Sequence, residues 1–148
     1  MSWNELRNGR CSIEQGEYFI TFVCHNRQRH FENDLAARIF CQQISINERM
    51  HGCAWQAWVL MPDHFHGLLR LGRSSLGKTV GHLKGVSAKR INDALLEQAF
   101  SWQSAYFDRA LRVDEDRVAV ARYIVANPIR SGLVTRIHDY PYWNAIWL

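Results

Sequence analysis

The chain has 148 residues, of which 47% are hydrophobic and 22% are charged. These proportions are typical of a folded globular protein, exclude a disordered chain, and at this length predict a single domain over residues 1–148. A formal net charge of +4 allows a polyanionic partner but does not establish one. No apolar run approaches the roughly 20 residues that cross a bilayer, so we expect no membrane partner.

The four cysteines show no spacing that suits a zinc site. They are Cys11, Cys24, Cys41 and Cys53. We expect reduced thiols, most of them buried, as in a cytoplasmic protein. The N-terminus lacks the apolar stretch of a signal peptide, which also favours the cytoplasm.

The first third of the chain predicts a strand followed by a helix. Residues 18–23 are aromatic or β-branched almost throughout, which is typical of a strand covered on both faces. Residues 34–50 carry apolar side chains at roughly helical spacing. We expect this helix to be capped by Asp34, to end at Gly52, and to bury Leu35, Ile39, Ile44 and Ile46.

The middle of the chain predicts two strands, residues 53–60 and 64–71, joined by a short turn. Such a short connection favours antiparallel neighbours. Side chains alternate between the two faces of a strand. The second strand should therefore place His64 and His66 on one face, opposite the apolar side chains Phe65, Leu69 and Leu71.

Three more elements follow. Residues 75 to about 100 predict a long helix, and residues 107–111 a short strand. The core face of that helix is predicted to contain Leu76, Val80, Leu83, Ile91 and Leu95. Residues 114–128 predict a last helix, because acidic residues at its start suit the helix dipole and Pro128 should end it. This order of strands and helices indicates an α+β fold.

His64 and His66 are the first candidate functional residues. Both imidazoles would project from one face of a strand, and two neutral imidazoles aimed at one point make half of a divalent-metal site. Asp63, a turn residue, could also accept a hydrogen bond from a ligand histidine. The alternative interpretation of an isolated His-x-His pair is a structural role.

Tyr123 and Asn127 form a second candidate pair. They are four residues apart in the last predicted helix, so they should lie one turn apart beside its apolar stripe. The functional interpretation is a nucleophilic phenol next to an amide that completes a metal shell. The structural interpretation is a packed ring and a residue that ends the helix.

Five segments stand in a fixed order along the chain, including Met-Pro-Asp-His-Phe-His at 61–66 and Tyr-Ile-Val-Ala-Asn-Pro at 123–128. In this order the chain resembles the single-tyrosine HUH transposases, and among them most closely the REP-associated tyrosine transposases. The resemblance covers nearly the whole chain, through residues 18–23, 57–66, 83–92, 102–108 and 122–134.

The resemblance implies a ferredoxin-like antiparallel β-sheet with helices packed on it. His64 and His66 match the two HUH histidines, Asn127 the third metal ligand, and Tyr123 the nucleophile. The implied cofactor is a divalent metal ion, Mg²⁺ or Mn²⁺, with zinc as a competing assignment for two histidines. The implied reaction cleaves single-stranded DNA through a 5′-phosphotyrosine, leaves a free 3′-OH, and permits strand transfer.

The implied partner is single-stranded or hairpin DNA, with REP palindromes as one candidate target, bound by a monomer or a homodimer in the cytoplasm. Cations that could contact its phosphates are Lys78, Lys84, Lys89 and Arg90 in the long helix and Arg27 and Arg29 after the first strand. Trp102, Tyr106, Tyr142 and Trp143 could stack on unpaired bases. A solvated helix face and burial in the core are the alternative interpretations of these cations and aromatic residues.

Two other functions remain open from the residues alone. A catalytically inactive nucleic-acid-binding module would present aromatic residues on its strands, but the glycine-aromatic signature of RNA-binding sheets is absent. A metal-dependent hydrolase that uses bound water would leave Tyr123 as a packing residue. A covalent adduct with single-stranded DNA in Mn²⁺ would separate these functions from a tyrosine transposase.

Overall fold

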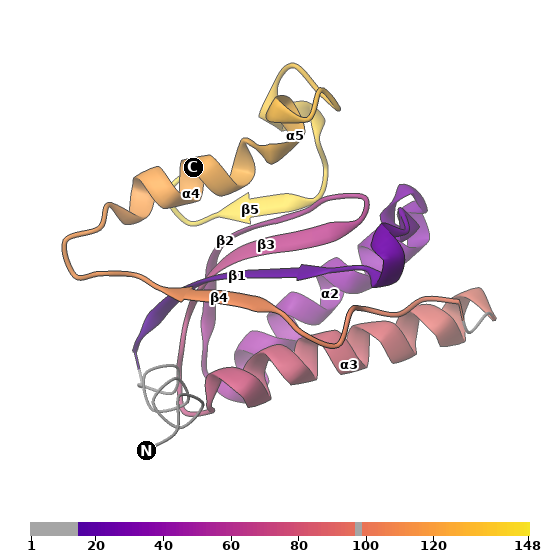
Figure 1. The fold of residues 1–148 in the computed structure, drawn as a ribbon, viewed down its shortest axis with the longest axis horizontal. Coiled ribbons are helices and arrows are strands. Elements are labelled where there is room, and N and C mark those ends of the chain that lie inside the picture. The colour runs from indigo at the N-terminus through magenta and orange to yellow at the C-terminus, as the bar shows by residue number, and fades with distance from the viewer. Residues whose placement is uncertain (1–14, 97–98) are drawn as a thin grey trace.

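The structure is a computed structural model and describes residues 15–96 and 99–148. Within this part of the chain, five antiparallel strands form one sheet in the order β4-β1-β3-β2-β5 (Figure 1). The strands are β1 (Glu17–Val23), β2 (Ala54–Leu60), β3 (His64–Arg70), β4 (Phe107–Ala110) and β5 (Trp143–Ala145).

Helices cover both faces of this sheet. On one face lie α2 (Asp34–His51) and α3 (Leu76–Leu95), and on the other lies α4 (Arg117–Val125), followed by the single turn α5 (Asn127–Arg130) (Figure 1). Short 3₁₀ turns occupy His25–Arg27, His30–Glu32 and Ile137–Asp139. The order β1-α2-β2-β3-α3-β4 is that of a ferredoxin-like unit, so the α+β prediction is confirmed.

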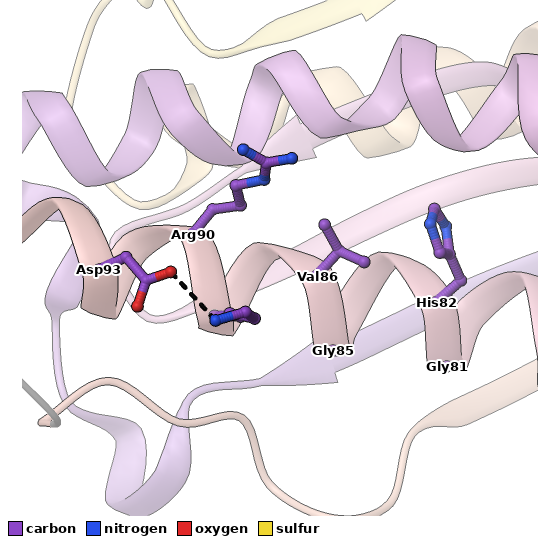
Figure 2. A pocket seen from close by; sticks show the side chains of 7 residues that line it. Gly81, His82, Gly85, Val86, Arg90 and Asp93 are labelled. Atoms are coloured by element: carbon purple, nitrogen blue, oxygen red, sulfur yellow. Dashed lines mark hydrogen bonds and ion pairs between the residues drawn. The ribbon is translucent and has the colours of Figure 1, made fainter.

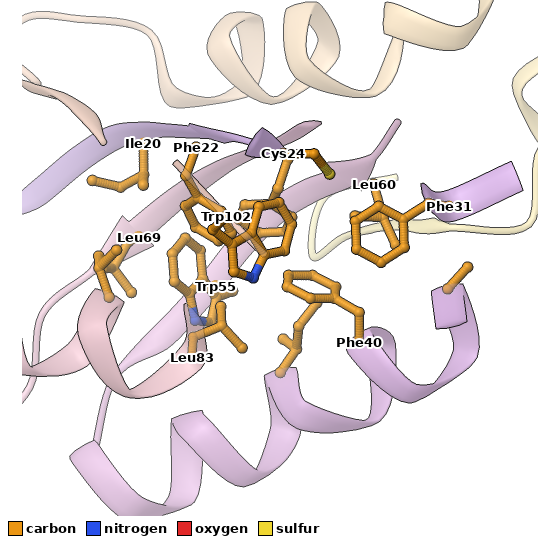
Figure 3. Close-up of a cluster of buried hydrophobic side chains, with 14 of the residues drawn as sticks. Ile20, Phe22, Cys24, Phe31, Phe40, Trp55, Leu60, Leu69, Leu83 and Trp102 are labelled. Carbon is orange, nitrogen blue, oxygen red and sulfur yellow. The ribbon is translucent and has the colours of Figure 1, made fainter. Parts of the chain in front are cut away.

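The face under α2 and α3 carries an aromatic core. Tyr18, Ile20 and Phe22 of β1 point into it, as strand alternation requires. The Phe22 and Phe65 rings stack with centroids 4.8 Å apart. Trp102 meets Phe22 edge-on, with centroids 4.7 Å apart, and both lie in the cluster drawn in Figure 3. The helices contribute buried side chains, namely Ala36, Ala37, Phe40, Ile44, Leu76, Val80, Leu83 and Ile91.

The opposite face carries a smaller aliphatic core beneath α4. Leu68 of β3 and Val59 of β2 pack there against Ala121 and Ile124. Strand β3 therefore alternates between two cores, with Phe65 and Leu69 in the aromatic one and Leu68 in the aliphatic one. His64 and His66 share the face of Leu68, as the alternation predicts.

Gly67 permits a close approach within the aromatic core. The Trp55 ring lies so near its Cα that an added Cβ would stand 2.7 Å from ring carbons. The Trp55 indole N–H also donates to Asn47 Oδ1 at 2.8 Å, which joins β2 to α2. The glycine after His66 is therefore required by packing on the far side of the sheet.

Three details of the sequence prediction are wrong. Asn33, not Asp34, caps α2, because its side chain accepts a hydrogen bond from Ala36 N. Leu35 is 44% exposed, since the helix buries the stripe through Ala36 and Phe40 instead. Strand β5 was not predicted, because three residues are too short to show an alternating pattern.

The last predicted helix is divided in two. Asp116 caps α4 by accepting from Ala119 N, and α4 ends at Val125, where Ala126 leaves the regular helix. Pro128 does not end a helix but stands in the first turn of α5, where its missing N–H is not needed. Tyr123 and Asn127 consequently lie on consecutive helices.

The predicted helix over residues 75–100 ends earlier than expected. Ser75 caps α3 and Leu96 ends it in a left-handed conformation. Phe100 is buried in the aromatic core but lies in the following loop, and residues 97–98 of the predicted helix lie outside the described residues. The predicted core face of α3 is confirmed, with Leu95 partly buried.

The described residues include three of the four cysteines. Cys24 and Cys53 are buried and Cys41 is half-buried, with no disulfide among these three, while Cys11 lies outside the described residues. Burial raises the pKa of the Cys24 and Cys41 thiols to about 12 and that of Cys53 to about 11.

No helix in residues 15–96 or 99–148 is long and apolar enough to span a membrane.

Replacing Ile44 with alanine should lower the free energy of unfolding by about 2–5 kcal/mol, because the side chain is buried beneath the sheet. Leu35→Ala on the same helix should lower it by a smaller amount, because 44% of Leu35 is exposed to solvent. Urea denaturation measures both values, and equal losses would contradict the assignment of the buried face of α2.

Candidate active site

His64 and His66 lie side by side on the α4 face of the sheet. Their ring centroids are 4.6 Å apart with the rings nearly perpendicular. Both side chains are partly buried, and Phe65 between them points into the opposite core. The two histidines predicted from the sequence therefore lie together, and both belong to β3, the central strand of the sheet.

A separate neighbour fixes the Nδ1 atom of each ring. His64 Nδ1 donates to Asp63 Oδ1 at 2.6 Å, and His66 Nδ1 lies 2.7 Å from Thr21 Oγ1 on β1. When both Nδ1 atoms donate, both Nε2 lone pairs are free for a ligand. A histidine that binds a metal is commonly oriented in this way by a hydrogen bond at its other nitrogen.

The charges around the pair favour a neutral His66. Burial, together with the charges of His64, Arg130 and Arg27, lowers the pKa of His66 to about 3. Burial raises the pKa of Asp63, but its hydrogen bond to His64 and its pairing with Arg27 outweigh this, so the net pKa lies below its usual range. An ionised carboxylate and a neutral imidazole are the forms that suit a metal shell.

Tyr123 stands on α4 with 59% of its surface exposed. The Arg130 guanidinium of α5 lies over its ring, with Cζ 4.1 Å from the centroid, within the range of a cation–π contact. The positive charge of Arg130 also contributes to lowering the pKa of His66. The predicted nucleophile and the predicted ligands are thus on one side of the sheet.

The other four tyrosines are less accessible. Tyr18 is buried and Tyr106 is partly buried. Tyr140 donates to the Leu60 carbonyl, and Tyr142 donates to the Asp34 carboxylate. Burial raises the pKa of Tyr140, while burial and then the Asp34 hydrogen bond raise that of Tyr142 to about 12. Accessibility therefore selects Tyr123 as the candidate nucleophile.

Asn127 has a definite structural task at the junction of α4 and α5. In a continuous helix, the Ile124 carbonyl would accept from the N–H of residue 128, but Pro128 has none. The Asn127 amide takes its place, with Nδ2 donating to Ile124 O at 2.8 Å. This bond turns the amide so that Oδ1, which has no hydrogen bond among the described residues, is the atom available to a ligand.

The donor set of the site fits a divalent metal ion of borderline or hard character. The described part of the chain holds no group of three or more His, Cys, Asp or Glu side chains that could bind a metal. A metal here would therefore depend on two imidazole nitrogens, with the Asn127 amide oxygen and water as further ligands. Imidazole with oxygen ligands suits Mn²⁺ better than Mg²⁺, and a carboxamide is a weak ligand for zinc.

The predicted phosphate contacts on α3 lie apart from this site. Lys78, Lys84, Lys89 and Arg90 belong to a helix that packs on the opposite face of the sheet. Figure 2 shows Arg90, Val86 and His82 pointing from α3 toward α2, and its dashed line marks the ion pair of Lys89 with Asp93 at 3.2 Å. Their role in DNA binding remains a prediction, but the structure does not bring them to the histidine pair.

Lys84 has internal contacts. Its ammonium donates to the carbonyls of Gln103 and Ala105 at 2.7 and 3.2 Å, which fastens the loop after α3 to the helix. Burial also lowers the pKa of this lysine. Lys84 therefore stabilises the fold whether or not DNA binds near it.

Arg27 is the predicted cation that the structure places at the site. Its Nη1 lies 3.4 Å from Asp63 Oδ2, so it joins the chain of contacts that ends at His64, and its side chain is largely exposed. Arg29 pairs with Glu32 in the same loop. Of the predicted stacking residues, Trp102 is buried and donates to Ser87 Oγ at 3.1 Å, so the core interpretation holds for it.

Comparison with known proteins agrees with this geometry. Residues 12–127, more than three quarters of the chain, match the family described as "Transposase IS200 like". The chain belongs to the IS200-like transposase family. It is therefore a transposase, and within that family it is similar to the REP-associated tyrosine transposases.

Two relatives of this IS200-like transposase carry the REP-associated name. The protein of Escherichia coli K12 is 24% identical over 135 residues, covering 90% of this chain and 78% of its own. A provisionally named counterpart from Haemophilus influenzae is 24% identical over 144 residues, covering 86% and 78%. The structure of a REP-associated tyrosine transposase bound to a REP hairpin shares the fold, with a TM-score of 0.73, 24% identity, and coverage of 89% and 78%.

Sequence patterns do not single out two residues of the candidate site, Thr21 and Arg130. Thr21 contacts His66 because β1 pairs with β3 in a register that sets these two residues opposite each other. Arg130 reaches Tyr123 because the chain turns between α4 and α5. The one sequence signal for Arg130 is its position three residues after Asn127, inside a segment that resembles the family.

Replacing Asn127 with alanine should lower the free energy of unfolding by about 1–2 kcal/mol, because the Ile124 carbonyl loses its amide partner. Ser131→Ala at the exposed residue that follows α5 removes only the hydrogen bond from its hydroxyl to Pro128 O, and it should lower the free energy of unfolding by less than Asn127→Ala does. Urea denaturation of both variants checks this assignment. Unchanged stability of Asn127→Ala would mean that the amide does not cap the carbonyl.

Proposed function

We propose that this transposase is a metal-dependent endonuclease and strand transferase for single-stranded DNA, with Tyr123 as nucleophile and a 5′-phosphotyrosine intermediate. The observation that carries the proposal is the position of an exposed phenol under Arg130 on the sheet face that holds His64 and His66. His64, His66 and Asn127 are the proposed metal ligands.

The metal ion, when bound, would polarise the scissile phosphate and stabilise negative charge on its oxygens. The chain itself supplies the nucleophile and its placement. The Tyr123 oxygen forms a bond to phosphorus and gives up its phenolic proton, while the bond from phosphorus to the 3′-oxygen breaks and that oxygen takes up a proton. The products are a 5′-phosphotyrosine and a 3′-OH. Attack of another strand's 3′-OH on the phosphorus of the phosphotyrosine would release the Tyr123 phenol and join the two strands.

The cations near the phenol suit a phosphodiester substrate. Arg130 stacks on the Tyr123 ring, which limits the ring's rotation, and its N–H groups remain able to donate to phosphate oxygens. Arg27 places a second exposed guanidinium beyond His64. These two arginines, rather than the lysines of α3, are the proposed contacts to the reacting phosphate.

We infer that the substrate is an unpaired strand or a hairpin. A related transposase has been seen with a REP hairpin bound, and an exposed phenol between sheet and helix can be approached by a flexible single strand. REP palindromes are therefore the first targets to test. The protein would bind them as a monomer or as a homodimer.

Replacing Tyr123 with phenylalanine should abolish covalent adduct formation and nicking while leaving the fold unchanged, because the variant lacks only an exposed oxygen. The wild type, incubated with single-stranded or hairpin DNA and Mn²⁺, should form an SDS-resistant adduct that mass spectrometry places on Tyr123. Continuous duplex DNA should give none.

Tyr140→Phe and Tyr142→Phe are matched controls, because their hydroxyls already donate to the Leu60 carbonyl and the Asp34 carboxylate. Both should retain the adduct. Cleavage by Tyr123→Phe would identify a hydrolase that uses water, and binding without cleavage by the wild type would identify an inactive binding module.

Replacing Thr21 with valine should weaken Mn²⁺ binding about 10- to 100-fold, because it removes the hydroxyl that orients His66 without changing the shape of the side chain. His64→Ala should weaken binding further and abolish cleavage, because it removes a proposed ligand. Isothermal titration calorimetry measures the affinity, and Thr135→Val at an exposed site is the matched control. An affinity unchanged in both site variants would refute this metal site.

A further inference from the structure

A hollow of about 470 Å³ opens beside Tyr123 on the α4 face of the sheet. Strands β1 and β4 supply Phe19, Phe107 and Arg109 to its wall, and α4 supplies Ala119, Val120 and Tyr123. We call it the β4–α4 hollow. Its lining is mostly apolar, yet it is open to solvent at the rim of the proposed active site.

The register of the sheet sets this hollow next to the histidine pair. Phe107 of β4 pairs with Thr21 of β1, and Thr21 pairs with His66 of β3. Paired residues point to the same face, so the three side chains form a row across adjacent strands. Two strand spacings separate Phe107 from His66, roughly 10 Å.

A second row runs parallel to the first. Arg109 pairs with Phe19, and Phe19 contacts the His66 ring with centroids 5.7 Å apart. The Phe19 side chain thus extends from the hollow to the proposed metal ligand. A phosphate at His66 and a planar group in the hollow would be about one nucleotide apart.

The chemistry of the hollow suits a flat aromatic group. Phe107 is 57% exposed and Tyr123 is 59% exposed, although both are large aromatic residues. Exposed aromatic side chains provide stacking surfaces for unpaired bases, whatever the base identity. Ala119 has a short side chain on the helix side, which leaves width for a ring to enter.

The hollow is lined by charges of both signs, namely Arg109, Glu115 and Asp116. Arg109 forms a two-point ion pair with Glu115, with contacts of 2.9 and 3.1 Å, and its guanidinium lies 5.9 Å from the Phe19 centroid. The pair holds the loop before α4 against β4, so the hollow is preformed. Arg130, which is not part of the lining, lies over the Tyr123 ring with Cζ 4.1 Å from its centroid.

We propose that the β4–α4 hollow receives the unpaired nucleobase adjacent to the phosphodiester that Tyr123 attacks, with the base stacked on Phe107. This assignment rests on the proposed function, because it takes Tyr123 as the nucleophile. The hollow positions the strand by the flat face of one base, so its contribution to affinity depends little on which base enters. Reaction specificity then includes the requirement that this base be unpaired.

A photocrosslinking experiment tests the assignment. Full-length Tyr123→Phe protein, which keeps the ring and cannot form the adduct, is irradiated with a thymidine oligonucleotide in which one thymine is replaced by 5-iodouracil. Mass spectrometry should place the crosslink on Phe107 or Phe19. In the same background, Phe107→Leu should weaken binding of the oligonucleotide at least about fivefold, because it keeps an apolar side chain and removes the stacking ring.

Trp147→Leu is the matched control. It also replaces an exposed aromatic residue with leucine, but follows β5 at the opposite edge of the sheet. It should leave the affinity for the oligonucleotide unchanged. Light scattering on both variants reports the oligomeric state, since β4 is an edge strand on which a second copy of the chain could also pack.

The outcomes separate the two proposals. Binding with a crosslink elsewhere and no effect of Phe107→Leu would overturn the base assignment while leaving Tyr123 chemistry intact. A change of oligomeric state in Phe107→Leu without loss of affinity would assign the hollow to a second copy of the chain and also overturn it. If wild-type protein neither binds single-stranded DNA nor forms an adduct with it, the proposed function fails and the base assignment fails with it.

Discussion

The alternation of side chains along β3 is the constraint on which the rest of the site depends. β3 lies in the middle of the sheet, with Phe65 in the aromatic core and His64 and His66 facing α4. A shift of one residue would bury both imidazoles beneath α2 and expose Phe65. Because hydrophobic burial of one large aromatic ring contributes a few kcal/mol, the core that holds Phe65 also fixes the direction of the histidines.

The site is assembled from elements that have other structural roles. Thr21 orients His66 as a residue of β1, and Asp63 orients His64 as a residue of the turn before β3. Asn127 satisfies a carbonyl that Pro128 leaves without a partner, because its Nδ2 donates to Ile124 O. Each of these contacts reduces the freedom of a proposed ligand before any metal or DNA arrives, and such preorganisation is what a catalytic site requires.

The two faces of the sheet differ in the size of their cores and in the side chains that they expose. The face under α2 and α3 buries the large aromatic cluster, and cations such as Lys84 contribute there to the fold. The face under α4 has a smaller core, and its periphery exposes Tyr123 and Phe107. An exposed aromatic residue loses hydrophobic stabilisation, which is why we propose that the hollow beside these two residues binds a base.

The sequence by itself determined the α+β order, most strand and helix positions, and the pairing of His64 with His66, because these depend on local periodicity and turn residues. A resemblance to a family also led to the prediction that Tyr123 and Asn127 belong to the site. Only the tertiary structure decided that α3 and its lysines lie on the opposite face, that the chain turns at Ala126, and that Thr21, Arg130 and Phe107 approach the site. Those features depend on strand register and on packing between segments far apart in the chain, neither of which leaves a periodic signal in the sequence.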